Sequence, residues 1–124
     1  MDFDQCACSG KSLVRLLRPA IMACLARGAA HGYQLAQNLR AMRMFAAQEP
    51  DHTGIYRALK EMETEGLLES SWELADAGPA KRRYELTTHG KRCLKRWQLT
   101  VQDYMEALKD LLAEISKAVA EVRT

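Results

Sequence analysis

The sequence has no apolar run long enough to cross a membrane, and it is not rich in glycine or proline. Its longest apolar stretch, residues 21–30, is broken by Arg27 and Gly28 and falls short of the roughly 18 residues that a span needs. Seven glycines and three prolines are too few for a linker-rich or disordered chain. The acidic start, Met1-Asp2-Phe3-Asp4, does not resemble a basic signal peptide. We therefore expect a cytoplasmic protein with no membrane partner.

The sequence also lacks a large excess of charge of one sign. Eighteen Lys and Arg residues against 16 Asp and Glu give a net charge of +2, which excludes a histone-like polycation. With 48% hydrophobic residues, a chain of 124 residues can form the core of one domain without disulfides. The four cysteines of a cytoplasmic protein are expected to be reduced.

No familiar catalytic pattern is present. The sequence has no Gly-rich phosphate loop, no Gly-x-Ser-x-Gly motif and no carboxylate pair in an apolar setting. The three histidines, His31, His52 and His89, are scattered along the chain. We therefore expect that the protein is not an enzyme and that it needs no cofactor.

Hydrophobic periodicity and turn residues predict three short helices, a β-hairpin and a long final helix. The expected ranges are 19–28, 31–42 and 51–66 for the short helices, 67–74 and 81–86 for the strands, and residue 87 or 88 almost to the end for the last helix. Asp51 or Thr53 is expected to cap the third helix, and residues 43–50 are expected to be a loop. This order is mainly α with a small β-hairpin, and it indicates a winged helix-turn-helix followed by a long C-terminal dimerisation helix.

The last helix carries apolar residues at alternating spacings of three and four, which is the heptad pattern of a coiled coil. These residues are Leu94, Trp97, Val101, Tyr104, Leu108, Leu111, Ile115, Ala118 and Val122. No other expected element is long enough to cover such a stripe. We therefore expect a homodimer, whose two-fold symmetry suits a palindromic DNA operator and whose interface includes Leu94, Val101, Leu108, Leu111 and Ile115. The expected domains are a leader over 1–18, a winged helix over 19–90 and the dimerisation helix over 91–124.

The third helix is the expected DNA-reading element. Its residues at spacings of three, one and three share one face, and these are Thr53, Tyr56, Arg57 and Lys60. Arginine suits guanine edges, whereas tyrosine, threonine and lysine suit phosphates. The alternative is an ordinary solvated face, which the acidic residues Glu61, Glu63 and Glu65 favour.

Two further groups are candidates for contacts with the DNA backbone. The second strand begins with three basic residues, which are Lys81, Arg82 and Arg83. Phosphates or the minor groove are their expected targets, and alternation along the strand places Arg82 opposite the other two. The alternative is that they pair with Glu69 and Glu73 across the hairpin. Tyr33, at the start of the second helix, either anchors a phosphate or packs on the core.

Four short motifs follow one another along the chain. They are His31-Gly32-Tyr33-Gln34-Leu35, Tyr56-Arg57-Ala58-Leu59, Glu65-Gly66-Leu67-Leu68 and Gly78-Pro79-Ala80-Lys81-Arg82-Arg83-Tyr84-Glu85-Leu86-Thr87, with Gly90 after the last. Together they resemble the PadR family of winged-helix transcriptional regulators over residues 19–122. The last motif and Trp97 are similar to the branch that includes polyhydroxybutyrate-responsive repressors. Thr53 stands where most members have glycine.

The resemblance implies a homodimeric repressor that binds double-stranded DNA and is released by a signal. Some PadR-like proteins bind flat aromatic compounds between their subunits, and Trp97 and Tyr104 are the candidate effector-binding residues here. The alternative is that both aromatic rings are packed interface residues. A different function is a winged-helix and coiled-coil adaptor that contacts only proteins and binds no DNA, which the acidic part of the third helix favours.

The cysteines suggest a second kind of signal. Cys6 and Cys8 lie close together in the leader, while His89 and Cys93 are four residues apart and face one side of a helix. A zinc site with three cysteines and one histidine, or a reversible disulfide to Cys93, is the sensor hypothesis. The alternative is that these cysteines are incidental and that Cys24 is buried in the first helix.

Overall fold

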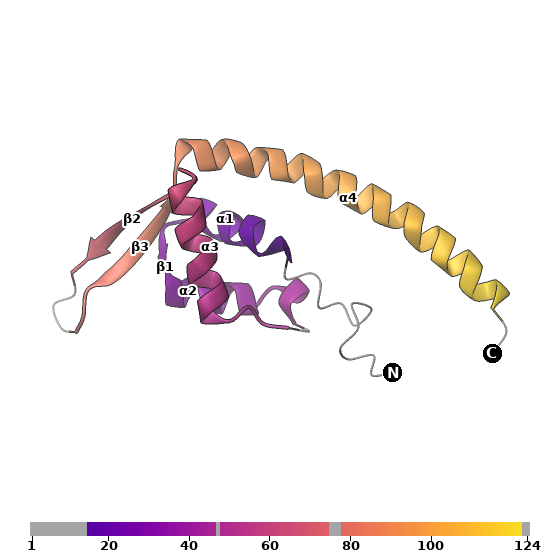
Figure 1. Ribbon diagram of the computed structural model, residues 1–124, viewed down its shortest axis with the longest axis horizontal. Coiled ribbons are helices and arrows are strands. Elements are labelled where there is room, and N and C mark those ends of the chain that lie inside the picture. Colours follow the sequence, from indigo (N-terminus) through magenta and orange to yellow (C-terminus); the bar gives the residue numbers. More distant parts are fainter. Residues whose placement is uncertain (1–14, 47, 75–77, 123–124) are drawn as a thin grey trace. The chain divides into compact units, whose positions relative to one another are not determined.

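The computed structural model describes residues 15–46, 48–74 and 78–122. The elements in order are α1 (Leu17–Ala26), β1 (Ala30–His31), α2 (Gly32–Arg40), the 3-10 helix η4 (Arg43–Phe45), α3 (His52–Thr64), β2 (Leu68–Glu73), β3 (Lys81–Leu86) and α4 (Thr88–Glu121) (Figure 1). The strands form an antiparallel sheet in the order β1-β3-β2. The predicted fold class, a mainly α winged helix with a long C-terminal helix, is confirmed. Within these described ranges, no helix is long and apolar enough to span a membrane.

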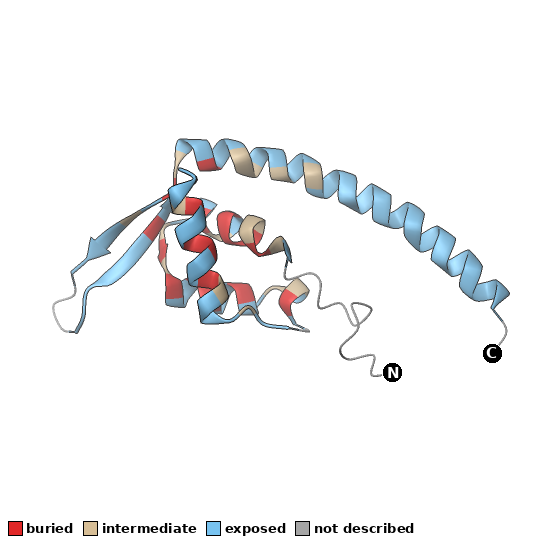
Figure 2. Cartoon of the chain, viewed as in Figure 1, coloured by how far each residue is buried: buried red, intermediate tan, exposed pale blue. Residues whose placement is uncertain are grey.

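The core lies where α1, α2 and α3 face one another and the base of the sheet (Figure 2). Ile21 of α1, Leu35 and Leu39 of α2, and Ile55 and Leu59 of α3 are all fully buried or nearly so. On α2 and on α3 the buried residues recur at a spacing of four, which places them on one face of each helix. Each of these two helices therefore has one buried face, and its opposite face is exposed.

The loop expected over residues 43–50 contains helix η4, and Phe45 at its end is fully buried. A single aromatic residue in a three-residue helix gives no periodicity, so the sequence pattern missed this part of the core. Strand β1 was also missed. Its two residues pair with Tyr84 and Arg83 of β3, and such a length is too short for alternation to reveal.

The ends of the three short helices differ from expectation by one or two residues. Helix α1 begins at Leu17 instead of Pro19, because proline is tolerated anywhere in a first turn, where its missing N–H has no helical partner. Helix α2 ends at Arg40, before Met42. The cap of α3 is Asp51, whose Oδ1 accepts a hydrogen bond from the backbone N–H of Gly54 at 2.6 Å. Thr53 lies inside the helix, so the alternative cap was wrong.

The hairpin of β2 and β3, here called the wing, is buried only at its base. Leu68 and Leu86 are register partners and are both buried, as is Tyr84. Farther along β2, Trp72 is 65% exposed although its side chain points to the same face of the hairpin as that of Leu68. The outer half of the wing therefore has no apolar core of its own.

Helix α4 begins with close packing against the turn that follows α3. Thr87 Oγ1 donates to the carbonyl oxygens of Gly66 and Leu67, at 2.7 and 3.0 Å, and accepts from the Gly90 N–H at 2.9 Å. A Cβ atom on Gly90 would collide with the carbonyl oxygen of Leu67 and lie 2.7 Å from Leu86 Cδ1. Glycine is therefore required for the first turn of α4 to approach the chain at Leu67.

The chain divides into two compact units after Leu94. The described part of the second unit, residues 95–122, is the remainder of α4 and contains no buried residue. The apolar side chains of the heptad stripe are largely exposed there, and Leu108, for example, is 59% exposed.

Candidate nucleic-acid interface

The outward face of α3 displays every residue of the DNA-reading set. Ile55, Leu59 and Met62 of α3 point into the core. The members of the DNA-reading set are all exposed, and they are Thr53, Tyr56, Arg57 and Lys60. The predicted shared face is therefore present, whereas contact with DNA stays a prediction.

Charge is unevenly distributed along α3. The first part holds the cations Arg57 and Lys60, and the following residues hold Glu61, Glu63 and Glu65. Two of these carboxylates are compensated, because Glu65 pairs with Arg18 of α1 and Glu63 pairs with Arg82 of the wing. The cations that face outward have no ion-pair partner within the described ranges. The acidic residues therefore weaken the predicted positive face less than their number suggests.

The start of α2 packs beneath the ring of Tyr56. A Cβ atom on Gly32 would lie 2.5 Å from Tyr56 Oη, so the absence of a side chain there admits the ring. The start of α2 is also capped by Gln34, whose Oε1 accepts a hydrogen bond from the backbone N–H of His31 at 3.0 Å. Tyr33 follows Gly32 and is 61% exposed, so the alternative that it packs on the core was wrong. Its predicted role as a phosphate anchor stays a prediction.

The three basic residues of the wing point to both faces of the hairpin. The register pairs Lys81 with Glu73, Arg82 with Trp72 and Arg83 with Ser71, so Arg82 points opposite the other two as expected. Arg83 Nη1 lies 3.9 Å from Glu73 Oε2, which is the cross-strand pairing that the alternative interpretation described. His31 of β1 contacts the same Glu73 oxygen through Nε2 at 2.7 Å.

Arg82 pairs with neither of the two expected acids. Its guanidinium contacts Glu63 of α3 and Ser70 of β2. Sequence reasoning missed Glu63 and Ser70 as partners, because a contact between α3 and the wing depends on tertiary packing. One signal was available in the sequence. Arg82 is two residues before the buried Tyr84 on the same strand, so both side chains point to the same face of the hairpin.

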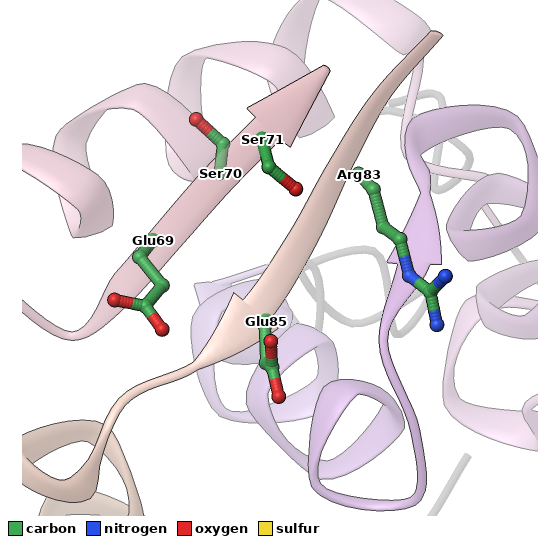
Figure 3. Close-up of a pocket in the computed structure, with 5 residues that line it drawn as sticks. All are labelled: Glu69, Ser70, Ser71, Arg83 and Glu85. Atoms are coloured by element: carbon green, nitrogen blue, oxygen red, sulfur yellow. The ribbon is translucent and has the colours of Figure 1, made fainter. Parts of the chain in front are cut away.

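The opposite face of the wing is a mixed polar surface. A hollow of about 390 Å³ is lined by Glu69, Ser70, Ser71, Arg83 and Glu85, with Arg83 directed toward β1 (Figure 3). Glu69 and Glu85 are register partners, and like charges directly opposite each other are unfavourable. Alternation along the strands puts three carboxylates on this face, Glu69, Glu73 and Glu85, against the two cations Lys81 and Arg83. The positive charge of Lys81 and Arg83 is therefore locally cancelled.

Two titratable groups are shifted by burial. Burial raises the pKa of the Tyr84 hydroxyl at the base of the wing, the charge of Arg82 opposes that shift, and Glu63 and Tyr56 add to it. Burial likewise raises the pKa of the half-buried Cys24 thiol, against a smaller opposing effect of Arg27. Both groups therefore stay protonated near neutral pH.

The structure describes only some of the residues named for the proposed metal or redox sensor and for the proposed effector site. Cys6 and Cys8 lie outside the described residues. His89 is exposed and Cys93 is half-buried, one turn apart on α4. No group of three or more potential metal ligands occurs within the described ranges. Trp97 is half-buried and Tyr104 is exposed on the same helix. Both sensor and effector roles stay predictions.

Comparison with known proteins gives consistent results. A sequence profile described as the transcriptional regulator PadR-like family matches residues 21–96, which is more than half of the chain. No curated protein matches. Among solved structures, a PadR family transcription regulator from hypervirulent Clostridium difficile R20291 is similar, with a TM-score of 0.69 and 22% identity over 78% of this chain and 98% of that chain. A PadR-like regulator from Bacillus cereus ATCC 14579 has a TM-score of 0.69 and 22% identity over 82% and 96%.

A third structure contains nucleic acid. Bacillus subtilis PadR in complex with operator DNA has a TM-score of 0.61 and 27% identity. The match covers 68% of this chain and 46% of that longer chain.

Proposed function

Because the chain belongs to the PadR-like family of transcriptional regulators, we propose that it is a homodimeric repressor that binds a palindromic DNA operator. The observation that carries the proposal is the exposed face of α3, on which Arg57 and Lys60 have no ion-pair partner within the described ranges. The operator complex of Bacillus subtilis PadR, which is 27% identical, supports it.

In the proposed complex, α3 enters the major groove and its residues have different tasks. Arg57 donates to a guanine edge, because a guanidinium matches the two acceptors of that base. Thr53, Tyr56 and Lys60 contact phosphates, which position the helix without reading sequence. Tyr33 at the start of α2 and Lys81 on the wing bind the flanking backbone.

The dimer is proposed to form along the heptad stripe of α4. Leu108, Leu111 and Ile115 are each about half exposed or more in the single chain. Pairing two stripes removes this apolar surface from water, which is the main driving force of coiled-coil association. The leader over 1–18, winged helix over 19–90 and dimerisation helix over 91–124 are the proposed functional divisions.

Release from DNA is proposed to follow binding of a planar small molecule near Trp97 and Tyr104. These residues are one heptad apart on the stripe, so they meet the partner helix in the proposed dimer. A ligand that favours one dimer geometry weakens DNA binding only if DNA favours another. Quenching of tryptophan fluorescence that runs in parallel with DNA release measures this coupling, and an unchanged response of Trp97→Ala to the inducer contradicts it.

The experiment that tests the function is selection of duplexes from a random-sequence pool, followed by gel-shift titration at several salt concentrations. We expect a two-fold symmetric sequence and an affinity that falls steeply with salt. Failure to enrich any sequence contradicts the DNA-binding proposal. The protein-only adaptor interpretation then takes its place.

A further inference from the structure

One polar network joins α3 to both strands of the wing. Arg82 Nε donates to Ser70 Oγ at 2.8 Å, and Arg82 Nη2 donates to Glu63 Oε1 at 3.3 Å. Ser70 Oγ in turn donates to the other carboxylate oxygen, Glu63 Oε2. The three side chains therefore form a closed ring of hydrogen bonds between one helix and two strands.

The guanidinium of Arg82 is also held from one side by Trp72. Its central carbon lies 5.6 Å from the centroid of the Trp72 ring, within the range of a cation–π contact. Trp72 is the register partner of Arg82 and is mostly exposed, so the core does not hold its ring. With two donors engaged and one face stacked, this guanidinium is less free than Arg57 to reach a phosphate.

The network lies where the apolar core of the wing ends. Leu68, Tyr84 and Leu86 at the base of the wing are buried, whereas residues 71–74 and 81–83 are all exposed. Apolar packing therefore sets only the base of the hairpin. On the side that faces α3, the ring of hydrogen bonds through Glu63 constrains the exposed half, and on the other side Glu73 ties it to β1.

We propose that Arg82 and Glu63 are positioning residues that hold the wing at a set angle to the DNA-reading helix, and that Arg82 does not itself bind a phosphate. This inference rests on the proposed function. Its consequence is that Glu63, a negative charge on the helix that enters the groove, strengthens DNA binding. The arrangement of α3 and wing before binding removes an ordering cost that a loosely attached wing would add.

The first test compares two neutralising substitutions on the same helix. Glu61 is exposed and has no ion-pair partner within the described ranges, so Glu61→Gln should leave binding unchanged or strengthen it. Glu63→Gln removes an equal charge but breaks the network, and we expect about five- to tenfold weaker binding to the duplex selected by the wild-type protein. The double variant of Glu63→Gln and Arg82→Gln should bind no more weakly than either single variant, since each single substitution already removes the same interaction.

The second test separates positioning from direct phosphate contact. Lys81→Gln, at an exposed wing position with no ion-pair partner within the described ranges, should reduce the slope of log affinity against log salt by about 0.9, the value for one lost phosphate contact. Arg82→Gln should weaken binding and leave the slope unchanged. Arg82→Lys should not restore wild-type affinity, because an ammonium lacks the planar fork that bonds Ser70 and Glu63 together.

A third measurement does not depend on DNA. Hydrogen–deuterium exchange of the free protein should be faster in the wing for Glu63→Gln and Arg82→Gln, with α1 unchanged, which also shows that both variants are folded. The inference is overturned if Glu63→Gln binds like Glu61→Gln, or if Arg82→Gln lowers the salt slope as Lys81→Gln does. A wild-type protein that selects no duplex contradicts the proposed function, and unchanged wing exchange in both variants then overturns the positioning role separately.

Discussion

At the residue scale, one arginine of α3 and one of the wing have different surroundings. Arg57 is exposed on α3 and has no ion-pair partner within the described ranges, whereas Arg82 contacts Glu63, Ser70 and Trp72. A guanidinium that must leave a carboxylate to reach DNA gains less from the new contact than one that is solvated. The two side chains are therefore expected to respond differently to the same substitution.

Arg57→Ala is expected to weaken binding to the selected duplex by about 1–3 kcal/mol and to relax preference at one base pair. The physical reason is the loss of a bidentate contact to a guanine edge, which carries sequence information. Lys81→Ala should instead weaken all duplexes about equally and flatten the salt dependence. Titration of the selected duplex and of its single-base variants measures both effects. Equal affinities of wild type and Arg57→Ala for every duplex would show that Arg57 reads no base.

The raised pKa of Tyr84 predicts a dependence of stability on alkaline pH. Burial raises the pKa in the folded protein, so the unfolded chain loses this proton first as the pH rises through about 10, the ordinary tyrosine value. The folded state then binds more protons than the unfolded state, and the free energy of unfolding falls with increasing pH. Urea denaturation at several alkaline pH values should show a steeper fall for wild type than for Tyr84→Phe. Tyr33→Phe, at an exposed position on α2, is the control that should behave like wild type.

At the element scale, long periodic segments were predictable and short ones were not. The bounds of β3, the start of α4 and the buried faces of α2 and α3 follow from local patterns that run over several residues. Strand β1 and helix η4 span two and three residues, so their places depend on neighbours far along the chain. The Glu63–Arg82 contact joins residues 19 positions apart and has the same limitation. The outward face of α3 was therefore predictable, and its connection to the wing was not.

At the start of α3, the Asp51 cap should contribute measurably to the stability of the protein. Asp51→Ala removes the side chain that caps the N–H of Gly54, and it should lower the free energy of unfolding by about 0.5–2 kcal/mol. Asp51→Asn keeps an acceptor oxygen and should lose much less. Thr53→Ala tests the rejected cap and should change little at the helix start. Urea denaturation of the three variants measures the effect, and a loss for Thr53→Ala as large as that for Asp51→Ala would contradict the assigned cap.

At the scale of the whole molecule, the proposed dimer explains the apolar stripe of α4. Monomeric proteins in water rarely expose a long continuous apolar surface, yet the residues from Val101 to Val122 on this stripe are exposed in the single chain. The charged residues between them, such as the Glu106–Lys109 pair, lie on the remaining faces of the helix. A helix with this distribution is typical of one half of a coiled coil.

Leu108→Glu is expected to separate the dimer into monomers at micromolar concentration or to unfold it. A buried, unpaired carboxylate costs several kcal/mol, which is a large part of the stability of a small dimer. Ala113→Glu introduces the same charge on the far side of the helix and is the matched control. Light scattering of both variants and of the wild type gives the mass. A wild-type protein that is monomeric at this concentration would rule out the dimer.

The sheet order β1-β3-β2 leaves β2 as an edge strand with one pairing neighbour in the described part of the chain. The free backbone groups of an edge strand are a template on which another copy can add, and this is a common route to aggregation. Glu69 and Glu73 place two negative charges on this six-residue strand, so two copies of the edge repel each other. Replacement of both by valine should turn the edge into a β-prone apolar segment, visible as concentration-dependent fibril formation. The same carboxylates that reduce the positive charge of the wing are thus expected to oppose the addition of a second copy of the protein at this edge.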